Sequence, residues 1–392
     1  MRRGIVQSLK NIDKLVGTPL CFFLGVFDKF LFRKKVTSTE FKRILVIKLI
    51  AIGDLVVTLP TLRAIKKRFP ENHLAILVTP RVKEVVEGCP CLDEIIYYDI
   101  LGEDRGIKGL FKIIRQIRER KFDLIIELEQ YYRITTLISY FAGIKNRVGF
   151  DLPGQGRRGL YTHRVPYLID KHEVEAFLEA ANRVGADTSD KELVEIWVSD
   201  ADKEYVTGLL TKAGITGKDF LVGIHPSTGA RDIKCRQWAL RKFAELADWL
   251  TKKYKAKVVF TGSNSEEALV REIVDLMSTK PIVAAGRTTL KQLAEIARRC
   301  QLFIALDTGP LHIAAAMKTK VIGLYGPNTP LKWGPYGKGH IAVYKALDCS
   351  PCIKQYRGQF SNCTNPICME DITVEDVQAA VLQMLKTEPI SA

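Results

Sequence analysis

The sequence has no run of about 20 consecutive apolar residues, the length that a transmembrane helix requires. Its apolar stretch at residues 15–27 is shorter and ends at Asp28 and Lys29. No small-residue cleavage site of the A-x-A kind follows Phe27, which disfavours a secretory signal peptide, and no G-x4-G-K-[ST] sequence of a P-loop occurs. With 47% hydrophobic and 26% charged residues over 392 positions, the composition is globular and excludes disorder, collagen and a polytopic membrane protein.

Acidic residues are fewer than basic residues. Asp and Glu number 44 against 59 Lys and Arg, which gives a formal charge of +15. Such an excess predicts an acidic partner, which is a nucleic acid, a phosphate-bearing small molecule or an anionic membrane surface. Because the basic residues do not accompany a recognisable DNA- or RNA-binding motif, we expect no nucleic-acid partner.

The charge is concentrated in the first 43 residues, which hold ten Lys or Arg against three Asp or Glu, a net charge of +7. Phe-rich stripes flanked by basic residues are typical of helices that lie in a membrane interface. We therefore expect residues 1–40 to form a basic amphipathic segment on a membrane surface; the alternative is a helix pair that packs on the core. The apolar stripes, separated by Pro19, are Ile5, Leu9, Ile12 and Val16, then Phe22, Phe23, Val26, Phe27, Phe30 and Leu31.

Cysteine occurs nine times. Five cysteines are scattered, which suits a reducing compartment where the residue behaves as a small apolar one. The other four form a C-x2-C-x10-C-x4-C pattern, a spacing close to that of structural four-thiolate zinc sites. A zinc ion there would hold together a loop that has few apolar residues; the alternative is free thiols or a disulfide pair. The four are Cys349, Cys352, Cys363 and Cys368.

Short apolar runs alternate with amphipathic helical patterns along the rest of the chain. The runs expected to form strands are residues 43–49, 73–79, 94–98, 122–128 and 147–150, then 220–225, 257–261, 281–284, 302–306 and 320–325. Helical patterns begin near residues 54, 81, 107 and 133 and cover 239–254, 265–277, 289–300 and 373–385. Continuous Val/Ile/Leu runs between helices indicate parallel strands covered on both faces. The predicted fold class is α/β, with two doubly wound Rossmann-like domains facing across a cleft.

The predicted organisation has four parts. They are the amphipathic segment 1–40, an N-terminal Rossmann-like domain at 41–190, a C-terminal one at 191–372 with the cysteine cluster 349–368, and a final helix and tail at 373–392. The final helix opens with a capping pattern at Thr373 and Asp376. Ligands of doubly wound domains bind at the carboxyl ends of the strands, and three motifs fall there.

The first motif, K-L-I-A-I-G-D-L at residues 48–55, ends the first predicted strand. We expect Gly53 to turn the backbone sharply and to place Asp54 at a helix start. A carboxylate in that position serves either as a helix cap or as a general base that accepts a proton from a substrate hydroxyl.

The second motif, residues 223–238, runs from a strand end at His225 through small hydroxylated residues and glycine into three cations. Exposed N–H groups, hydroxyls and the cations Arg231, Lys234 and Arg236 together suit a diphosphate.

The third motif, residues 303–316, leads from a buried strand into D-T-G-P and a small-residue helix. We expect the amides of Thr308 and Gly309, which follow Asp307, to face the ligand at the positive end of that helix. His312 lies one turn further on and is either a buried histidine with satisfied hydrogen bonds or a ligand contact.

Together with T-G-S-x3-E at residues 261–267 and G-L-Y-G-P at 323–327, these motifs resemble glycosyltransferase family 9, the bacterial heptosyltransferases of lipopolysaccharide core assembly. The resemblance covers roughly residues 41–381. It implies a GT-B fold and a metal-independent, cofactor-free, inverting transfer of a heptose from ADP-heptose to a glycolipid acceptor. The protein would then be cytoplasmic and peripheral on the inner face of the cytoplasmic membrane.

Matching motif positions implies roles for single residues. Asp54 would be the base on the acceptor hydroxyl, and Glu266 or Glu267 would contact the donor ribose. Arg236 stands where the family has a lysine two residues before Trp238. The other residues expected to hold the donor are Ser227, Thr228, Arg231, Lys234, Gly262, Ser263, Asp307, Thr308, Gly309 and His312. Those expected near the acceptor are Gly53, Arg133, Arg157 and Arg158, and for the arginines a solvated basic surface is the alternative.

Two other function classes fit parts of the sequence. The first is another GT-B glycosyltransferase, or a sugar-nucleotide epimerase, that uses a different nucleotide sugar. The second is not an enzyme: a membrane-associated protein that binds an anionic ligand.

Overall fold

The computed structural model describes residues 10–31, 40–229 and 233–387, which form two compact units. Unit 1 comprises Met1–Lys191 and the short segment Gln355–Gly358, and unit 2 comprises Glu192–Lys354 and Gln359–Ala392. Unit 1 thus includes the described part of the N-terminal segment, and unit 2 includes the last helix.

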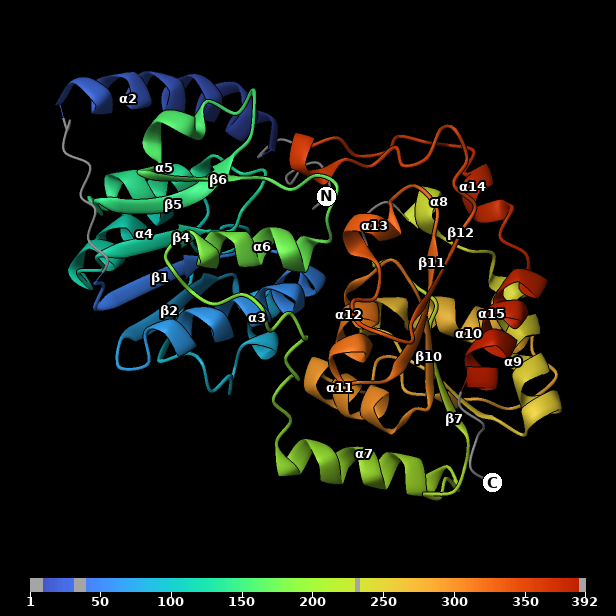
Figure 1. Cartoon of the computed structure of the whole chain (residues 1–392). Coiled ribbons are helices and arrows are strands. Elements are labelled where there is room, and N and C mark those ends of the chain that lie inside the picture. Colours follow the sequence, from blue (N-terminus) through green and yellow to red (C-terminus); the bar gives the residue numbers. More distant parts are fainter. Residues whose placement is uncertain (1–9, 32–39, 230–232, 388–392) are drawn as a thin grey trace. The chain divides into compact units, whose positions relative to one another are not determined.

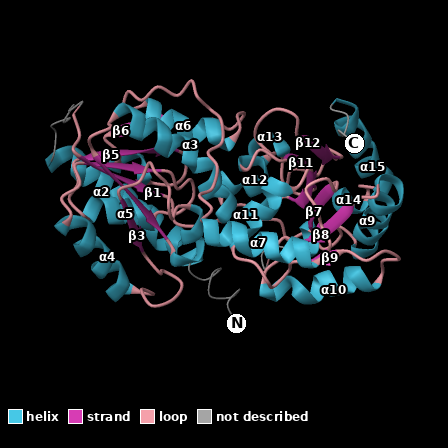
Figure 2. Ribbon diagram, turned by 90° about the horizontal axis from the view of Figure 1, so that it is seen from below, coloured by secondary structure: helices cyan, strands magenta, loops and turns pink. Residues whose placement is uncertain are grey.

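Unit 1 is built on a six-stranded parallel sheet with the strand order β3-β2-β1-β4-β5-β6. Helices α3 and α6 pack together on one face of the sheet, and α4 and α5 on the other (Figures 1 and 2). The strands are β1 (Arg43–Ile47), β2 (His73–Val78), β3 (Glu94–Tyr97), β4 (Leu124–Glu127), β5 (Asn146–Asp151) and β6 (His163–Pro166). The helices are α3 (Ile52–Arg68), α4 (Ile107–Glu119), α5 (Ile134–Phe141) and α6 (Glu173–Asn182), with the 3-10 helices η2 (Pro80–Val85) and η3 (Arg157–Leu160).

Unit 2 repeats the same topology with the order β12-β11-β10-β7-β8-β9. Its strands are β7 (Leu221–His225), β8 (Lys257–Phe260), β9 (Ile282–Val283), β10 (Leu302–Leu306), β11 (Lys320–Tyr325) and β12 (Ile341–Tyr344). Helices α9 (Leu240–Tyr254), α10 (Glu267–Asp275) and α15 (Val374–Thr387) cover one face, and α7 (Asp200–Lys212), α11 (Leu290–Arg299) and α12 (Gly309–Ala316) the other. The connections contain α8 (Ile233–Arg236), α13 (Pro330–Trp333), α14 (Ile367–Glu370) and η4 (Asn264–Glu266). The 3-10 helix η5 (Gln355–Arg357) lies in the segment that belongs to unit 1.

The predicted fold class of two Rossmann-like α/β domains is confirmed. The predicted cap of the last helix is also confirmed, because the backbone N–H of Asp376 donates to Thr373 Oγ1 at 3.2 Å and that of Thr373 to Asp376 Oδ2 at 2.8 Å. The helical pattern near residue 81 forms only the 3-10 helix η2, since Gly88 and Pro90 stop a longer helix. The edge strands β6 and β12 were not predicted, because a strand paired on one side needs no continuous apolar run.

Each sheet has a topological switch point, where consecutive strands continue on opposite sides of the first strand. In unit 1 it lies between β1 and β4, where Ile47 pairs with Glu127, and in unit 2 between β7 and β10, where His225 pairs with Ala305. Ligands of doubly wound sheets bind beyond the carboxyl ends of the strands at this point. We therefore expect ligands to bind at the loops after β1 and β4 in unit 1 and after β7 and β10 in unit 2.

The described part of the N-terminal segment packs on unit 1 through one face. It forms the π-helix η1 (Asp13–Gly17) and α2 (Thr18–Leu31), which lies along α5 and η3 (Figure 1). Cys21 packs against Leu137 and Leu160. The Asp13 carboxylate accepts hydrogen bonds from the first backbone N–H groups of α5, at 2.8–3.0 Å.

The outward face of the same segment is apolar. Within the ranges that the structure describes, no helix is both long enough and apolar enough to cross a bilayer. The apolar side chains on this face are 38–73% exposed: Ile12, Leu15, Val16, Leu20, Phe22, Phe23, Val26 and Phe27.

Candidate functional site

Asp54 lies in the first turn of α3, just beyond the carboxyl end of β1. The residue that turns the backbone is Ala51, with φ at +76°, whereas Gly53 lies inside the helix. The prediction that Gly53 makes this turn is therefore wrong: the helix begins at Ile52, so the change of direction falls on the residue before it. A non-glycine residue in this conformation costs roughly 1–3 kcal/mol, and such strain is concentrated at functional sites.

The Asp54 carboxylate is held by a buried lysine. Lys48 Nζ lies 2.8 Å from Asp54 Oδ2 and 3.3 Å from Glu129 Oε2. It also donates to Gln130 Oε1 at 3.1 Å. The Lys48 side chain is 1% exposed and that of Asp54 is 16% exposed. Lys48 thus directs its ammonium at this group of side chains, while Asp54 keeps access from outside.

A third carboxylate belongs to the same group. Glu173, at the start of α6, is fully buried. It accepts hydrogen bonds from the Gln130 amide and from the Tyr167 hydroxyl, the latter at 2.8 and 2.9 Å. We call Lys48, Asp54, Glu129, Gln130 and Glu173 the Asp54 cluster.

The pKa values of Asp54 and Lys48 are both raised. Burial raises the pKa of Asp54, and the negative charges of Glu129 and Glu173 add to this, against the lowering effect of Lys48. Burial would lower the pKa of Lys48, but its attraction to Asp54 and Glu129 outweighs burial and the pKa is raised. A carboxylate of raised pKa beside a permanent cation is suited to accept a proton from a hydroxyl.

Most of this cluster was missed by sequence reasoning. Lys48 stood in the first motif, and Glu129 and Gln130 directly follow the run at 122–128, whose strand neighbours β1. That adjacency was the available signal, since loops after neighbouring parallel strands meet at one sheet edge. No local pattern pointed to Glu173.

The arginines expected near the acceptor lie in different environments. Arg157 is 1% exposed, and its guanidinium bonds Glu127 Oε1 at 3.0 Å and backbone carbonyls, including that of Gln130 at 2.8 Å. Arg133 is 4% exposed and pairs with Asp13 at 3.7 Å. Arg158 is 67% exposed and lies 3.2 Å from Asp151. Of these three arginines, only Arg158 is accessible to a ligand.

In unit 2, the loop after β7 is small and polar. Ser227 and Thr228 are buried, and Ser227 Oγ accepts a hydrogen bond from the backbone N–H of Gly229 at 3.1 Å. Within the described residues, the buried Thr228 Oγ1 has no hydrogen-bond partner. A buried hydroxyl without a protein partner is available to hydrogen-bond a ligand that enters the loop.

Arg236 connects this loop to the one after β10. Its Nη1 lies 3.4 Å from Asp307 Oδ2 and donates to the Asp307 carbonyl at 3.1 Å. Asn328, which follows β11, donates to Asp307 Oδ2 at 2.8 Å and was not predicted. Among the described residues, the Arg236 Nε has no hydrogen-bond partner. Arg231 lies outside the described residues, as does the side chain of Lys234.

The third motif forms the start of α12 as expected from its sequence. Thr308 is the N-cap residue in an extended conformation, and Pro310 occupies the first turn. Thr308 and Gly309 are half-buried. Because they directly follow Asp307, the N–H groups of the first turn, which have no acceptor within the helix, lie next to that residue. His312 is 2% exposed and its ring lies 6.2 Å from that of Trp333.

The two glutamates after β8 face different partners. Ser263 and Glu266 form a capping box, with the Ser263 N–H 2.6 Å from Glu266 Oε2. Burial acts to raise the pKa of Glu266, but His225 and hydrogen bonds from Ser263 and Ser227 lower it further than burial raises it. Glu267 instead pairs with Arg271 at 2.6 Å. Glu266 is thus the glutamate in contact with the Ser227 loop, and an added Cβ on the neighbouring Gly262 would lie 3.3 Å from it.

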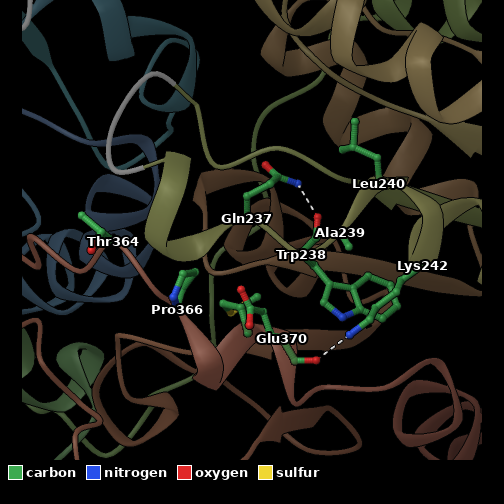
Figure 3. A pocket seen from close by; sticks show the side chains of 9 residues that line it. Gln237, Trp238, Ala239, Leu240, Lys242, Thr364, Pro366 and Glu370 are labelled. Atoms are coloured by element: carbon green, nitrogen blue, oxygen red, sulfur yellow. Dashed lines mark hydrogen bonds between the residues drawn. The ribbon is translucent and has the colours of Figure 1, made fainter.

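A pocket of about 650 Å³ lies beside this region in unit 2 (Figure 3). Its lining includes Gln237, Trp238, Lys242, Pro366 and Glu370. None of the residues expected to hold the donor lines this pocket. Arg236 directly precedes the lining residue Gln237 in the sequence. We therefore assign no ligand to the pocket.

The four clustered cysteines lie in the segment that follows β12, and Cys368 is part of α14. Cys352 Sγ lies 3.1 Å from Ser361 Oγ, and the other three thiols contribute to raising the pKa of Cys368, which burial raises to about 11. All nine cysteines are free, and nowhere in the described ranges do three or more His, Cys, Asp or Glu side chains gather closely enough to hold a metal.

Comparison with known proteins places the chain in a family. The family model of glycosyltransferase family 9 (heptosyltransferase) matches residues 110–359, more than half of the chain. The chain is 28% identical to lipopolysaccharide heptosyltransferase 3 of Escherichia coli over 344 residues, 85% of this chain and 96% of that protein.

Solved structures agree in fold. A glycosyltransferase family 9 protein from Veillonella parvula has a TM-score of 0.77 at 26% identity and covers 88% of this chain and 98% of that one. The E. coli heptosyltransferase WaaC, solved with ADP-2-deoxy-2-fluoro heptose, has a TM-score of 0.64 at 15% identity, over 87% of this chain and 99% of that one. The chain therefore belongs to glycosyltransferase family 9, the heptosyltransferases, and is a glycosyltransferase with the GT-B fold.

Proposed function

We propose that the protein transfers a heptose from ADP-heptose to a sugar hydroxyl of a lipopolysaccharide core acceptor, with inversion and without a metal. The observation that carries this proposal is the Asp54 cluster: a partly exposed carboxylate of raised pKa at the switch point of unit 1. The binding of an ADP-heptose analogue by WaaC supports the donor. Unit 1 is then the acceptor domain and unit 2 the donor domain.

The reaction exchanges one C–O bond for another. The acceptor oxygen bonds to the anomeric carbon as the bond from that carbon to the diphosphate breaks, and ADP leaves with the electron pair. Asp54 accepts the proton of the acceptor hydroxyl from the face opposite the leaving group, which inverts the anomeric centre. Arg236 and the free N–H groups at the start of α12 stabilise the charge that develops on the diphosphate.

The other residues of the proposed donor site bind the phosphates and the ribose of ADP-heptose. The Ser227 and Thr228 loop contacts the phosphates, together with one cation among Arg231, Lys234 and Arg236. Glu266 contacts the ribose, because it lies against the Ser227 loop while Glu267 is paired with Arg271.

The experiment is a transfer assay with purified protein, ADP-heptose and truncated lipopolysaccharide core, followed by mass spectrometry of the glycolipid. We expect a mass increase of one heptose and an unchanged rate in EDTA. Binding of ADP, UDP and GDP is compared in parallel, since the base pocket discriminates among them and the diphosphate loop does not. Preference for UDP or GDP, or epimerisation of the sugar without transfer, would contradict the proposal.

We further propose that α2 rests on an anionic membrane surface, which makes the protein peripheral at the inner face of the cytoplasmic membrane. Its exposed face carries Phe22, Phe23 and Phe27, each 58–59% exposed. Two acids of the segment, Asp13 and Asp28, are 9% and 18% exposed and engaged with unit 1, where Asp28 lies 3.3 Å from Arg147. Of the charged side chains that the structure describes in residues 10–31, Lys14 remains exposed, and the sequence of residues 1–43 has a net charge of +7, which suits anionic headgroups.

Vesicle sedimentation tests this surface. We expect the protein to sediment with phosphatidylglycerol vesicles and only weakly with phosphatidylcholine vesicles. The triple variant F22S/F23S/F27S should stay in the supernatant, whereas F111S, which removes a phenylalanine 65% exposed on α4, should bind as the wild type does. Equal binding of the triple variant would contradict the proposal.

The cysteine loop is proposed to hold a structural zinc ion. Four thiols between residues 349 and 368 are a donor set whose chemistry suits Zn²⁺, and the ion would have to draw them together, since they form no metal-holding group in the described structure. Elemental analysis of protein purified without chelator should give about one zinc per chain, lost in C349S/C352S and retained in the control C300S. Zinc-free protein with four reactive thiols would favour free cysteines.

A further inference from the structure

A short segment from the C-terminal part of the chain belongs to unit 1. Residues Gln355–Gly358 form the tip of a hairpin whose neck is an antiparallel bridge between Lys354 and Gln359. The tip is part of unit 1, whereas the two arms of the hairpin belong to unit 2. We call residues 355–358 the hairpin tip.

The hairpin tip is fixed on the loop that carries Gln130. The Gln155 amide donates to the Tyr356 carbonyl at 2.9 Å and to the Gln130 carbonyl at 2.8 Å. Gly358 has φ at +65°, and an added Cβ would lie 1.7 Å from the Tyr131 ring. The tip is thus bound by a buried side chain and by a close approach that only glycine permits.

Tyr356 reaches the Asp54 cluster through one other side chain. Its ring lies 5.6 Å from that of Tyr167, which in turn lies 5.3 Å from the Phe150 ring. The Tyr167 hydroxyl donates to both carboxylate oxygens of Glu173. Burial and the neighbouring Glu173 charge raise the pKa of Tyr167 well above its ordinary value, so the hydroxyl keeps the proton that it donates.

The position of Glu173 matters to the base for an electrostatic reason. Its charge acts on both Lys48 and Asp54, raising the pKa of each. It also fixes the Gln130 amide, whose oxygen accepts from Lys48 at 3.1 Å. A displacement of Glu173 would therefore change both the orientation of Lys48 and the charge around Asp54.

We propose that Tyr356 is a positioning residue for the Asp54 base. By packing on Tyr167, it keeps the Tyr167 hydroxyl on Glu173 and thereby holds Lys48 and Asp54 in their reactive arrangement. The inference rests on the proposed role of Asp54. It makes the base of the N-terminal domain depend on a segment supplied by the C-terminal part of the chain.

The test compares Y356A with Y356F in the transfer assay. Removing the ring should lower kcat by up to about a hundredfold, the cost of a small misplacement of a reacting group, and should move the acidic limb of the pH profile of kcat. The KM for ADP-heptose should not change. Y356F keeps the ring contact and should behave as the wild type.

Two further variants distinguish a loss of positioning from a folding defect. Y167F keeps the ring but removes the hydroxyl, and G358A forces the tip away from Tyr131; both should reproduce the Y356A shift in the pH profile, with thermal unfolding recorded for each. Wild-type kcat and pH profile in Y356A would overturn the inference. If D54N is inactive and Y356A is normal, the inference fails alone; if D54N is active, the proposed function fails.

Discussion

The two switch points have the same topology and opposite chemistry. At that of unit 1, the carboxylates of Asp54 and Glu129 contact one buried ammonium, and Asp54 stays partly exposed. At that of unit 2, a guanidinium and the start of a helix lie among small hydroxylated residues, and one carboxylate, Asp307, is already paired. The strand order decides where a ligand is held, and the residues after β1, β4, β7 and β10 decide what is done to it.

In the proposed function, each unit supplies one step. Accepting a proton needs a carboxylate of raised pKa, which burial and like charges supply in unit 1. Stabilising a leaving diphosphate needs positive charge and free N–H groups, which unit 2 supplies. Variants at the two points should therefore fail in different ways.

The largest effect is expected at Asp54. D54N keeps the shape of the side chain but cannot accept the proton, so kcat should fall by roughly 10²–10⁴. ADP affinity, measured by calorimetry, should be unchanged because the proposed donor site lies in the other unit. Substantial residual transfer in D54N would refute the assignment of the base.

The next effect is expected at Arg236. Removing its positive charge in R236A should lower kcat by roughly 10²–10³, the cost of losing one stabilising donor, and weaken ADP binding. R236K keeps the charge and should retain part of the activity. If R236A transfers normally while R231A or K234A does not, the diphosphate cation lies elsewhere in the loop.

A smaller and pH-dependent effect is expected at Lys48. Its charge lowers the pKa of Asp54, so in K48M that pKa should rise and a larger fraction of the base should be protonated at pH 7. Each unit by which the pKa of Asp54 rises should lower kcat about tenfold at pH values below the new pKa. The activity of K48M should recover as the pH increases. The control K66M removes a lysine paired with Asp93 at 2.8 Å and should leave the profile of kcat/KM unchanged.

The smallest effect on the chemistry is expected at Arg157, a structural arginine. R157M leaves the buried Glu127 without its cation and should lower the free energy of unfolding by roughly 3–5 kcal/mol, measured with urea, while the folded fraction keeps its turnover. R158M, at an exposed position, should change stability by less than about 0.5 kcal/mol. A stable R157M with a raised acceptor KM would restore the acceptor role that its sequence position suggested.

The elements with strong local signals were predictable. Strand β10 (Leu302–Leu306) and strand β11 (Lys320–Tyr325) coincide with the predicted ranges, because a strand buried on both faces is a continuous apolar run. The edge strands β6 and β12 were missed and the length of η2 was misjudged, since pairing on one side and nearby helix breakers leave a weak pattern.

The sequence alone determined the order of ten of the twelve strands, the family, the positions of Asp54 and Asp307 after β1 and β10, and that of Arg236 before Trp238, because these depend on local periodicity and contiguous motifs. Only the tertiary structure decided that Lys48, Glu129 and Glu173 surround Asp54, that Arg157 is buried rather than available to an acceptor, and that the hairpin tip packs beside Tyr167. The Lys48–Glu129 contact joins residues 81 positions apart, and the Gln155–Tyr356 contact, which holds the hairpin tip, joins residues 201 positions apart. No local pattern encodes such separations, because burial and charge depend on which strand ends the topology brings to the same edge of a sheet.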